Sequence, residues 1–193
     1  MTSRKLRAQA FVELRAEDPE ATSALAVARS HLEAGGTLVA LRRLRVFELA
    51  GALPERDAIA ERLHGSTQFY NPAKERCVVR AVDDDASPFG TDEVLVLVLE
   101  RGGDRRPGAE RWWRHETGGR IEVREGVVWA MLFAAGEDAV RRGEDLAVTR
   151  DRTHGLLANP QFQEARVCAT APPPLDWLSR KSWRPTKRPR RSA

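Results

Sequence analysis

The residues of this chain best suited to metal binding or nucleophilic chemistry are four histidines and two cysteines. No two histidines stand at the HxxxH spacing that places both imidazoles on one helix face, and no CxxC pair occurs. His64-Gly65 and His154-Gly155 both stand near the ends of expected helices, which favours a helix-end role over a ligand role. Cys77 and Cys168 have no motif that would supply a base, so we expect small apolar fillers. The sequence therefore predicts no metal site and no catalytic residue.

Phosphate-binding signatures are absent from the sequence as well. Neither GxxxxGK[ST] nor GxGxxG occurs, and the paired glycines suit turns and helix ends. Carboxylates are frequent, but solvated helix faces explain them better than an acid–base pair does. We therefore expect no nucleotide-binding loop and no bound cofactor.

Bulk composition indicates a globular protein. Of the 193 residues, 41% are hydrophobic and 31% are charged, which is enough apolar material for a core. The longest apolar run, "VLVLVL" at 94–99, has the length of a strand and is too short to span a membrane. The start "MTSRKLRAQAF" lacks the apolar stretch of a secretory signal, so we expect a cytoplasmic protein with no membrane contact.

The net charge of +4 arises at one end of the chain. Residues 175–193 contain seven basic residues and one acidic residue, so the remaining 25 basic and 27 acidic residues leave the body slightly acidic. A body without basic excess is poorly suited to tracking phosphates. The range 170–193, which begins with a proline run, is predicted to be a disordered tail that could bind an acidic protein or RNA. Its basic residues are Arg180, Lys181, Arg184, Lys187, Arg188, Arg190 and Arg191.

Two stretches of similar order make up the rest. In the first, 8–15 alternates like a half-buried strand, and a helix follows with Asp18 as N-cap, Pro19 in the first position and Gly35-Gly36 as a left-handed stop. Residues 37–49 are extended, in one or two strands, 54–65 are helical, and a strand closes the unit near residue 82. We call residues 8–82 the first predicted unit; 83–92 is an expected linker.

The second predicted unit, residues 93–169, repeats this order. Its strand at 93–100 precedes a short helix that ends at Gly118-Gly119. The apolar runs of 121–133 meet at Arg124-Glu125-Gly126, which predicts a hairpin. A charged helix is expected over 137–157 and a last strand after it. Asn159-Pro160 then matches Asn71-Pro72, and Leu41-Arg42 matches Val123-Arg124, which aligns Phe47 with Trp129.

Two motifs carry a family resemblance. Val123-Arg124-Glu125-Gly126 and Leu156-Leu157-Ala158-Asn159-Pro160 resemble the Val-Arg-x-Gly and Leu-Leu-x-Asn-Pro patterns of the PurS family. In the first unit, Leu44 replaces the glycine and Phe69-Tyr70 precedes Asn71, whereas Asp18-Pro19 fits the family's first helix. PurS proteins are small subunits of phosphoribosylformylglycinamidine synthase in purine biosynthesis.

The resemblance implies an α+β fold of two tandem βαββαβ ferredoxin-like (PurS-like) units packed as a pseudo-dimer. It also implies a non-catalytic subunit of a ligase complex that bridges the ATP-dependent synthetase and the glutaminase for ammonia transfer. The residues expected to contact these partners are Arg42, Asn71, Pro72, Trp112, Trp113, Arg124, Asn159 and Pro160.

Alternatives stay open at this point. Adjacent Trp112 and Trp113 point about 100° apart on a helix, so a contact between units or with a partner and simple burial are equally consistent with the sequence. The basic tail, with Trp177 and Trp183 as stacking faces, would instead suit a nucleic-acid-binding protein. A small-ligand-binding regulatory module of ACT-like shape is a third possibility.

Overall fold

The computed structural model describes residues 6–83, 85–169 and 171–180. Within these ranges the chain forms one mixed α+β structure whose six strands make a single antiparallel sheet in the order β3-β1-β2-β5-β4-β6. The strands are β1 (Leu6–Leu14), β2 (Leu38–Gly51), β3 (Glu75–Arg80), β4 (Val94–Glu100), β5 (Ile121–Phe133) and β6 (Gln163–Cys168). The predicted α+β class is confirmed.

The helices begin and end largely where side-chain chemistry predicts. They are α1 (Pro19–His31), the 3-10 turn η1 (Glu33–Thr37), α2 (Arg56–His64), α3 (Pro107–Thr117) and α4 (Ala139–Ala147). The Asp18 carboxylate accepts the amide N–H of Glu20 at 2.9 Å, as expected of an N-cap. Gly118 ends α3 in the left-handed conformation, with φ of 71°.

Two predicted helix ends are wrong. Gly35 does not form a left-handed stop; it lies in η1, where a Cβ would stand only 1.9 Å from the carbonyl oxygen of Ala28. The helix expected over 137–157 ends at Ala147, because the chain then folds back on itself. Thr149 N–H donates to the carbonyl oxygen of Ala158, and Leu156 N–H donates to that of Leu146.

The predicted hairpin at Arg124-Glu125-Gly126 is also wrong. These residues lie inside the single strand β5, which pairs with β2 from Ile121↔Gly51 to Phe133↔Leu38. Gly126 meets a packing need rather than a turn, since a Cβ there would lie 2.7 Å from Leu99 Cδ2. The middle of each predicted unit is therefore one long strand, and each unit reads βαβαβ instead of βαββαβ.

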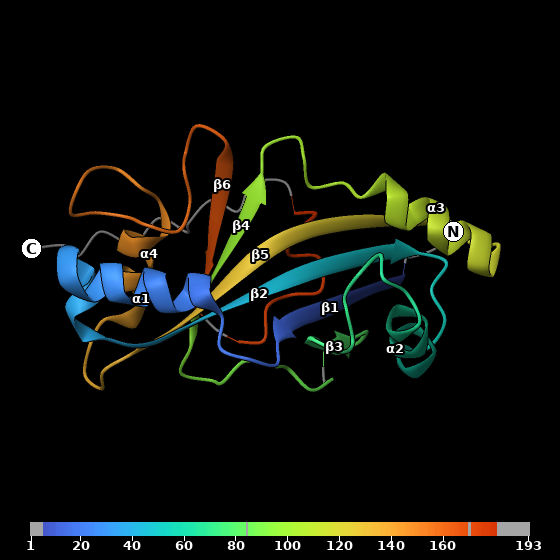
Figure 1. The fold of residues 1–193 in the computed structure, drawn as a ribbon, viewed down its shortest axis with the longest axis horizontal. Coiled ribbons are helices and arrows are strands. Elements are labelled where there is room, and N and C mark those ends of the chain that lie inside the picture. Colours follow the sequence, from blue (N-terminus) through green and yellow to red (C-terminus); the bar gives the residue numbers. More distant parts are fainter. Residues whose placement is uncertain (1–5, 84, 170, 181–193) are drawn as a thin grey trace, which may run out of the picture.

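Each of the long strands β2 and β5 pairs with the first strand of its own predicted unit over only part of its length. β1 pairs with β2 only from Arg45 to Gly51, and β4 pairs with β5 only from Val127 to Met131. Arg45 and Val127 are themselves opposite one another in the sheet. The remaining part of each long strand extends past the strands of its own predicted unit. Figure 1 shows β2 and β5 running side by side along the molecule, with α1 and α4 near one end and α2 and α3 near the other.

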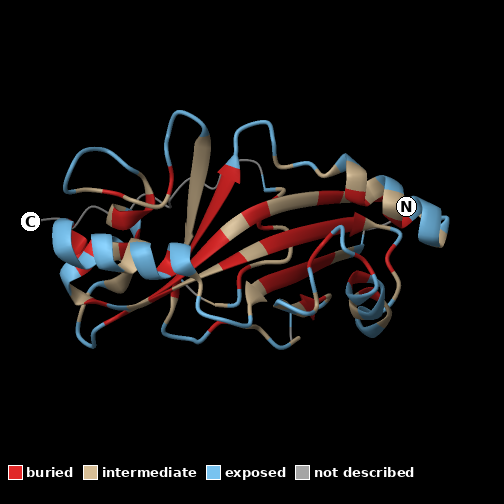
Figure 2. Cartoon of the chain, viewed as in Figure 1, coloured by how far each residue is buried: buried red, intermediate tan, exposed pale blue. Residues whose placement is uncertain are grey.

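Both cores on the helical face combine residues from the two predicted units. In one, Trp113 of α3 and Val123 of β5 pack among Phe47, Ile59 and further residues of β1, β2, α2 and β3. In the other, residues of α1 and the start of β2 pack among β4, the end of β5 and α4; they include Ala21, Ala28, Leu38, Leu41, Val96, Met131 and Leu146. The first helix of each unit, α1 or α3, therefore contributes to a core that also contains strands of the other predicted unit. The strands are mostly buried or intermediate, whereas the outer faces of the helices are exposed (Figure 2).

The chain covers its own helix-free sheet face. Phe11, Leu44, Val46, Leu95, Leu97 and Val128 form this apolar face. Phe89, within the expected linker, packs edge-on against Phe11 with ring centroids 5.0 Å apart. Residues 171–180, which we call the strap, complete the cover with Trp177 and Leu178, which are 4% and 2% exposed.

The strap corrects the prediction of a tail disordered from residue 170. Burial of Trp177 and Leu178 holds it on the sheet, so Trp177 is a core residue and offers no stacking face. Trp183 lies outside the described residues. No helix within the described ranges is both long and apolar enough to cross a membrane.

Candidate functional site

The two Asn-Pro turns have the same hydrogen-bonding pattern. In the first, the Asn71 side-chain oxygen accepts the amide N–H of Ala73 at 3.0 Å, and the Asn71 N–H donates to the Glu75 carboxylate at 2.7 Å. In the second, the Asn159 side-chain oxygen accepts the amide N–H of Gln161 at 3.0 Å. The Asn159 N–H donates to the side-chain oxygen of the residue four positions on, Gln163, at 2.9 Å.

The two Asn-Pro turns also have the same backbone hydrogen bond. The carbonyl oxygens of Asn71 and Asn159 each accept the N–H of the residue four positions on, both at 2.8 Å. Each turn leads directly into an outer strand, β3 or β6, and these strands form opposite edges of the sheet. Asn71-Pro72 and Asn159-Pro160 are therefore matching turns at opposite edges, and they do not come together in one site.

Arg42 ties the connection between the predicted units to the sheet. Its guanidinium pairs with Glu93 at 3.0 Å and with Glu13 at 3.4 Å, and it donates to the carbonyl oxygen of Pro88 at 2.8 Å. All of its nitrogens thus have partners within the chain. These bonds explain Arg42 structurally, without a contact to another protein.

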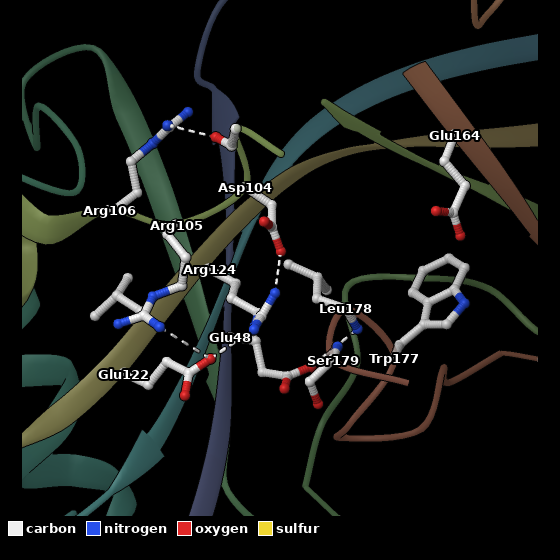
Figure 3. A network of polar contacts seen from close by, with 12 residues as sticks. Glu48, Asp104, Arg105, Arg106, Glu122, Arg124, Glu164, Trp177, Leu178 and Ser179 are labelled. Atoms are coloured by element: carbon white, nitrogen blue, oxygen red, sulfur yellow. Dashed lines mark hydrogen bonds and ion pairs between the residues drawn. The ribbon is translucent and has the colours of Figure 1, made fainter. Parts of the chain in front are cut away.

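Arg124 lies on the same helix-free face in β5. It pairs with Asp104 and, at 2.7 Å, with Glu122, and Arg105 also reaches Glu122 (Figure 3). The side chain of Arg124 is 28% exposed, so a partner could reach this cluster only at its outer edge.

The tryptophan pair contacts residues from both predicted units. Trp113 is fully buried in the core that contains Phe47 and Leu63. Trp112 is partly buried and lies edge-on to Phe69, with ring centroids 5.9 Å apart. Because α3 and Phe69 come from different units, the contact between units expected as one alternative is present, and burial accompanies it.

Three buried polar side chains hold the strap, which sequence reasoning missed. The Gln9 amide donates to the carbonyl oxygen of Pro174 at 2.7 Å, and the Arg80 guanidinium donates to that of Pro173 at 2.9 Å. The Glu48 carboxylate accepts the N–H of Leu178 at 2.9 Å. Gln9 and Arg80 are 0% exposed and Glu48 is 2% exposed. Buried polar groups are costly unless paired, so these residues make the strap an integral part of the fold.

The pKa of the Glu48 carboxyl is shifted by its buried position. Burial raises its pKa above the ordinary value, opposed by the hydrogen bond from Ser179 and by the charge of Arg7. Arg7 contacts the carboxylate at 2.5 Å and donates to the Ser179 hydroxyl at 2.6 Å. The alternation of Gln9 with apolar residues over 8–15 was visible in the sequence, but nothing local identified the strap as a partner of Gln9 or Arg7.

Of the seven basic residues of the predicted tail, the structure describes Arg180, which pairs with Asp176 at 2.6 Å. Lys181, Arg184, Lys187, Arg188, Arg190 and Arg191 lie outside the described residues. The prediction that they bind an acidic partner stays a prediction.

His64, His154 and Cys77 have environments that suit structural roles. His64 Nδ1 lies 3.0 Å from the Tyr70 hydroxyl, and His154 bonds to Asp151, which raises the pKa of the imidazole. Burial raises the pKa of the Cys77 thiol to about 12, which disfavours the reactive thiolate. Within the described ranges, no three His, Cys, Asp or Glu side chains gather as they would around a metal ion.

The surface pockets differ in the polarity of their lining. One of about 600 Å³, between η1, α4 and the loop before His154, is lined by both acidic and basic side chains, including Glu33, Arg142 and Asp145. A groove of about 440 Å³ lies between α1 and Leu156-Leu157, with Trp129 beside it. The two leucines of the predicted Leu-Leu-x-Asn-Pro motif therefore line a surface groove.

Comparison with known proteins gives no relative: the chain matches no protein-family model, no curated protein and no solved structure.

Proposed function

We propose that the chain is a tandem PurS-like protein, two ferredoxin-like units packed as a pseudo-dimer on one polypeptide. The observation that carries the proposal is the pair of matching Asn-Pro turns, which lead into the outer strands at opposite edges of one sheet. The strand order β3-β1-β2-β5-β4-β6 also has matching strands at equal distances from its centre.

The exchange of helices supports this interpretation physically. β3, β1, the second part of β2 and the first part of β5 lie next to one another, and α2 and α3 cover them. Four antiparallel strands with two helices on one face correspond to one ferredoxin-like unit, to which the second unit contributes a helix and half a strand. Opening a hairpin into one straight strand is the usual geometry of a domain swap. A chain of this kind buries more surface than a unit of half its length could bury alone.

We infer that the function is assembly rather than catalysis. The chain would join the ATP-dependent synthetase and the glutaminase of the phosphoribosylformylglycinamidine synthase complex, as the motif resemblance suggests. The charges of Arg42 are paired within the chain, and the raised pKa of the Cys77 thiol disfavours a nucleophilic role for this cysteine. The family motifs and the matching turns support this role together.

A reconstitution assay tests the proposal. The full chain is added to the purified synthetase and glutaminase of the same organism, and conversion of formylglycinamide ribonucleotide to the amidine is followed with glutamine as nitrogen source. We expect glutamine-dependent activity to require the chain. Activity with free ammonia is the control, because it needs the synthetase alone. Full glutamine-dependent activity without the chain, or no association of the three proteins, would overturn the assignment.

The nucleic-acid-binding alternative is tested by one deletion. Because residues 171–180 belong to the fold, the deletion should remove only residues 181–193. Salt-sensitive RNA binding that disappears with this deletion would favour the alternative.

A further inference from the structure

The groove between α1 and the turn before Asn159 has a filled counterpart elsewhere in the same molecule. Pro19 and Pro107 stand in the first turns of α1 and α3, and Ala24 and Trp112 each follow their proline by five positions. The two helices therefore place a small side chain and an indole at matching positions.

The surroundings of these positions match as well. Phe69 and Leu157 each precede the asparagine of their turn by two residues. Phe69 packs edge-on between Phe47, at 5.3 Å, and Trp112, at 5.9 Å. Leu157 lines the groove together with Trp129, the residue that aligns with Phe47. Trp112 thus occupies one of the two matching places, whereas the place beside Ala24 is left open.

The open groove has the chemistry to accept an indole. Its walls are apolar, with Pro19, Ala24, Leu156 and Leu157, and Trp129 offers a ring for an edge-on contact. The carboxylate of Glu20 stands at the rim with 66% of its side chain exposed; one oxygen pairs with Arg43 at 3.0 Å, and the other can accept an indole N–H. The groove volume of about 440 Å³ exceeds that of one tryptophan side chain.

We propose that this groove binds a tryptophan side chain of a partner protein, in the place that Trp112 occupies in the other half. A protein is the occupant because the groove opens along the surface, beside the exposed side chains of Glu20 and Ser23. A free indole would keep one face in water there, whereas a partner surface would cover that face and complete the burial. The partner's identity rests on the assembly role proposed above; the groove itself does not.

A titration without any partner tests the groove. The probe is N-acetyl-L-tryptophanamide, added to the ¹⁵N-labelled full chain, and the readout is the indole N–H signal of Trp129, assigned with a Trp129→Phe variant. We expect a saturable shift of this signal. Ala24→Trp fills the groove as Trp112 fills its counterpart, so the saturable shift should be lost. Val27→Trp, on the exposed face of the same helix, adds an indole elsewhere and should leave the shift intact.

Removal of the Trp112 side chain from the matching place gives an independent measurement. Trp112→Ala should create a second binding site, seen as a new saturable shift of the Trp113 indole signal. No shift of Trp129 at the solubility limit of the probe, or an undiminished shift in Ala24→Trp, would overturn the groove assignment.

A capture experiment with the two variants then tests whether the bound indole belongs to a partner protein or to a free small molecule. Ala24→Trp should lose a partner protein that Val27→Trp retains. Equal capture by both variants would overturn the assignment to a protein. Failure of the purine-complex reconstitution would leave the probe titration unaffected, so the two proposals can fail separately.

Discussion

The Glu48 carboxylate accepts a hydrogen bond from the backbone N–H of Leu178, 130 residues further along the chain, at 2.9 Å. This bond links a central strand to the strap, and Arg7 contacts the other carboxylate oxygen. Because burial raises the pKa of Glu48, the link responds to pH.

The first prediction concerns that response. A carboxyl whose pKa is higher in the folded state binds its proton more tightly there, so it stabilises the fold at low pH. This contribution falls as pH rises from the ordinary value of 4.5 through the raised folded-state pKa. Glu48→Gln removes the titration and keeps an acceptor. We expect the free energy of unfolding of the wild type to fall relative to that of Glu48→Gln as pH rises through this window.

Urea denaturation at a series of pH values measures the difference. Glu116→Gln is the matched control, since its side chain is 48% exposed. A wild type that instead gains stability relative to Glu48→Gln as pH rises would show that the ion pair with Arg7 outweighs burial.

The second prediction tests whether the strap contributes to stability. Trp177→Ala removes a side chain that is only 4% exposed, and truncation of a buried tryptophan costs about 3–5 kcal/mol. Phe162→Ala is the control, because Phe162 is 63% exposed and should change stability by less than about 0.5 kcal/mol. Thermal or urea unfolding of the two variants provides the comparison. Equal, small effects would mean that the strap is not held on the sheet in solution.

Sequence reasoning located the features whose chemistry is local. The Asp18 cap, Pro19 at the helix start and Gly118 at the end of α3 each act within one turn of chain, and each is where it was predicted. The matching Asn-Pro turns belong to the same class, since their hydrogen bonds span no more than four residues.

The remaining features depend on contacts between distant segments. A glycine such as Gly126 is compatible both with a turn and with the close approach of a neighbouring side chain. The close approach is made by Leu97 and Leu99 of another strand, which the local sequence does not reveal. Trp177 follows a proline run and precedes basic residues, a composition typical of disorder, yet Gln9 and Glu48 hold the strap in place. The open groove became visible only when α1 and α3 could be compared in the fold.

The third prediction concerns the straight course of β5. Gly126→Ala would place a Cβ 2.7 Å from Leu99 Cδ2 and 2.8 Å from Leu97 Cδ1, so these side chains must shift. Overpacking of this kind costs about 1–3 kcal/mol. Gly36→Ala is the control, since a Cβ there meets nothing within 4 Å and Gly36 has no positive φ. It should be neutral or slightly stabilising. A Gly126→Ala variant as stable as the wild type would argue against the close packing of Leu97 and Leu99 on this position of β5.

The last prediction tests whether the two Asn-Pro turns are equivalent. Asn71→Ala and Asn159→Ala each remove one side-chain acceptor of a backbone N–H at 3.0 Å, so each should lower the free energy of unfolding by about 0.5–1.5 kcal/mol. The turns lie at opposite edges of the sheet and share no partner, so the double variant should show the sum of the two effects. Asn71→Asp and Asn159→Asp keep the acceptor oxygen and should retain most of the stability. Urea denaturation of the single and double variants measures these differences. Strongly unequal losses would mean that the matching hydrogen bonds do not reflect matching energetic roles, and the pseudo-dimer proposal would lose its main support.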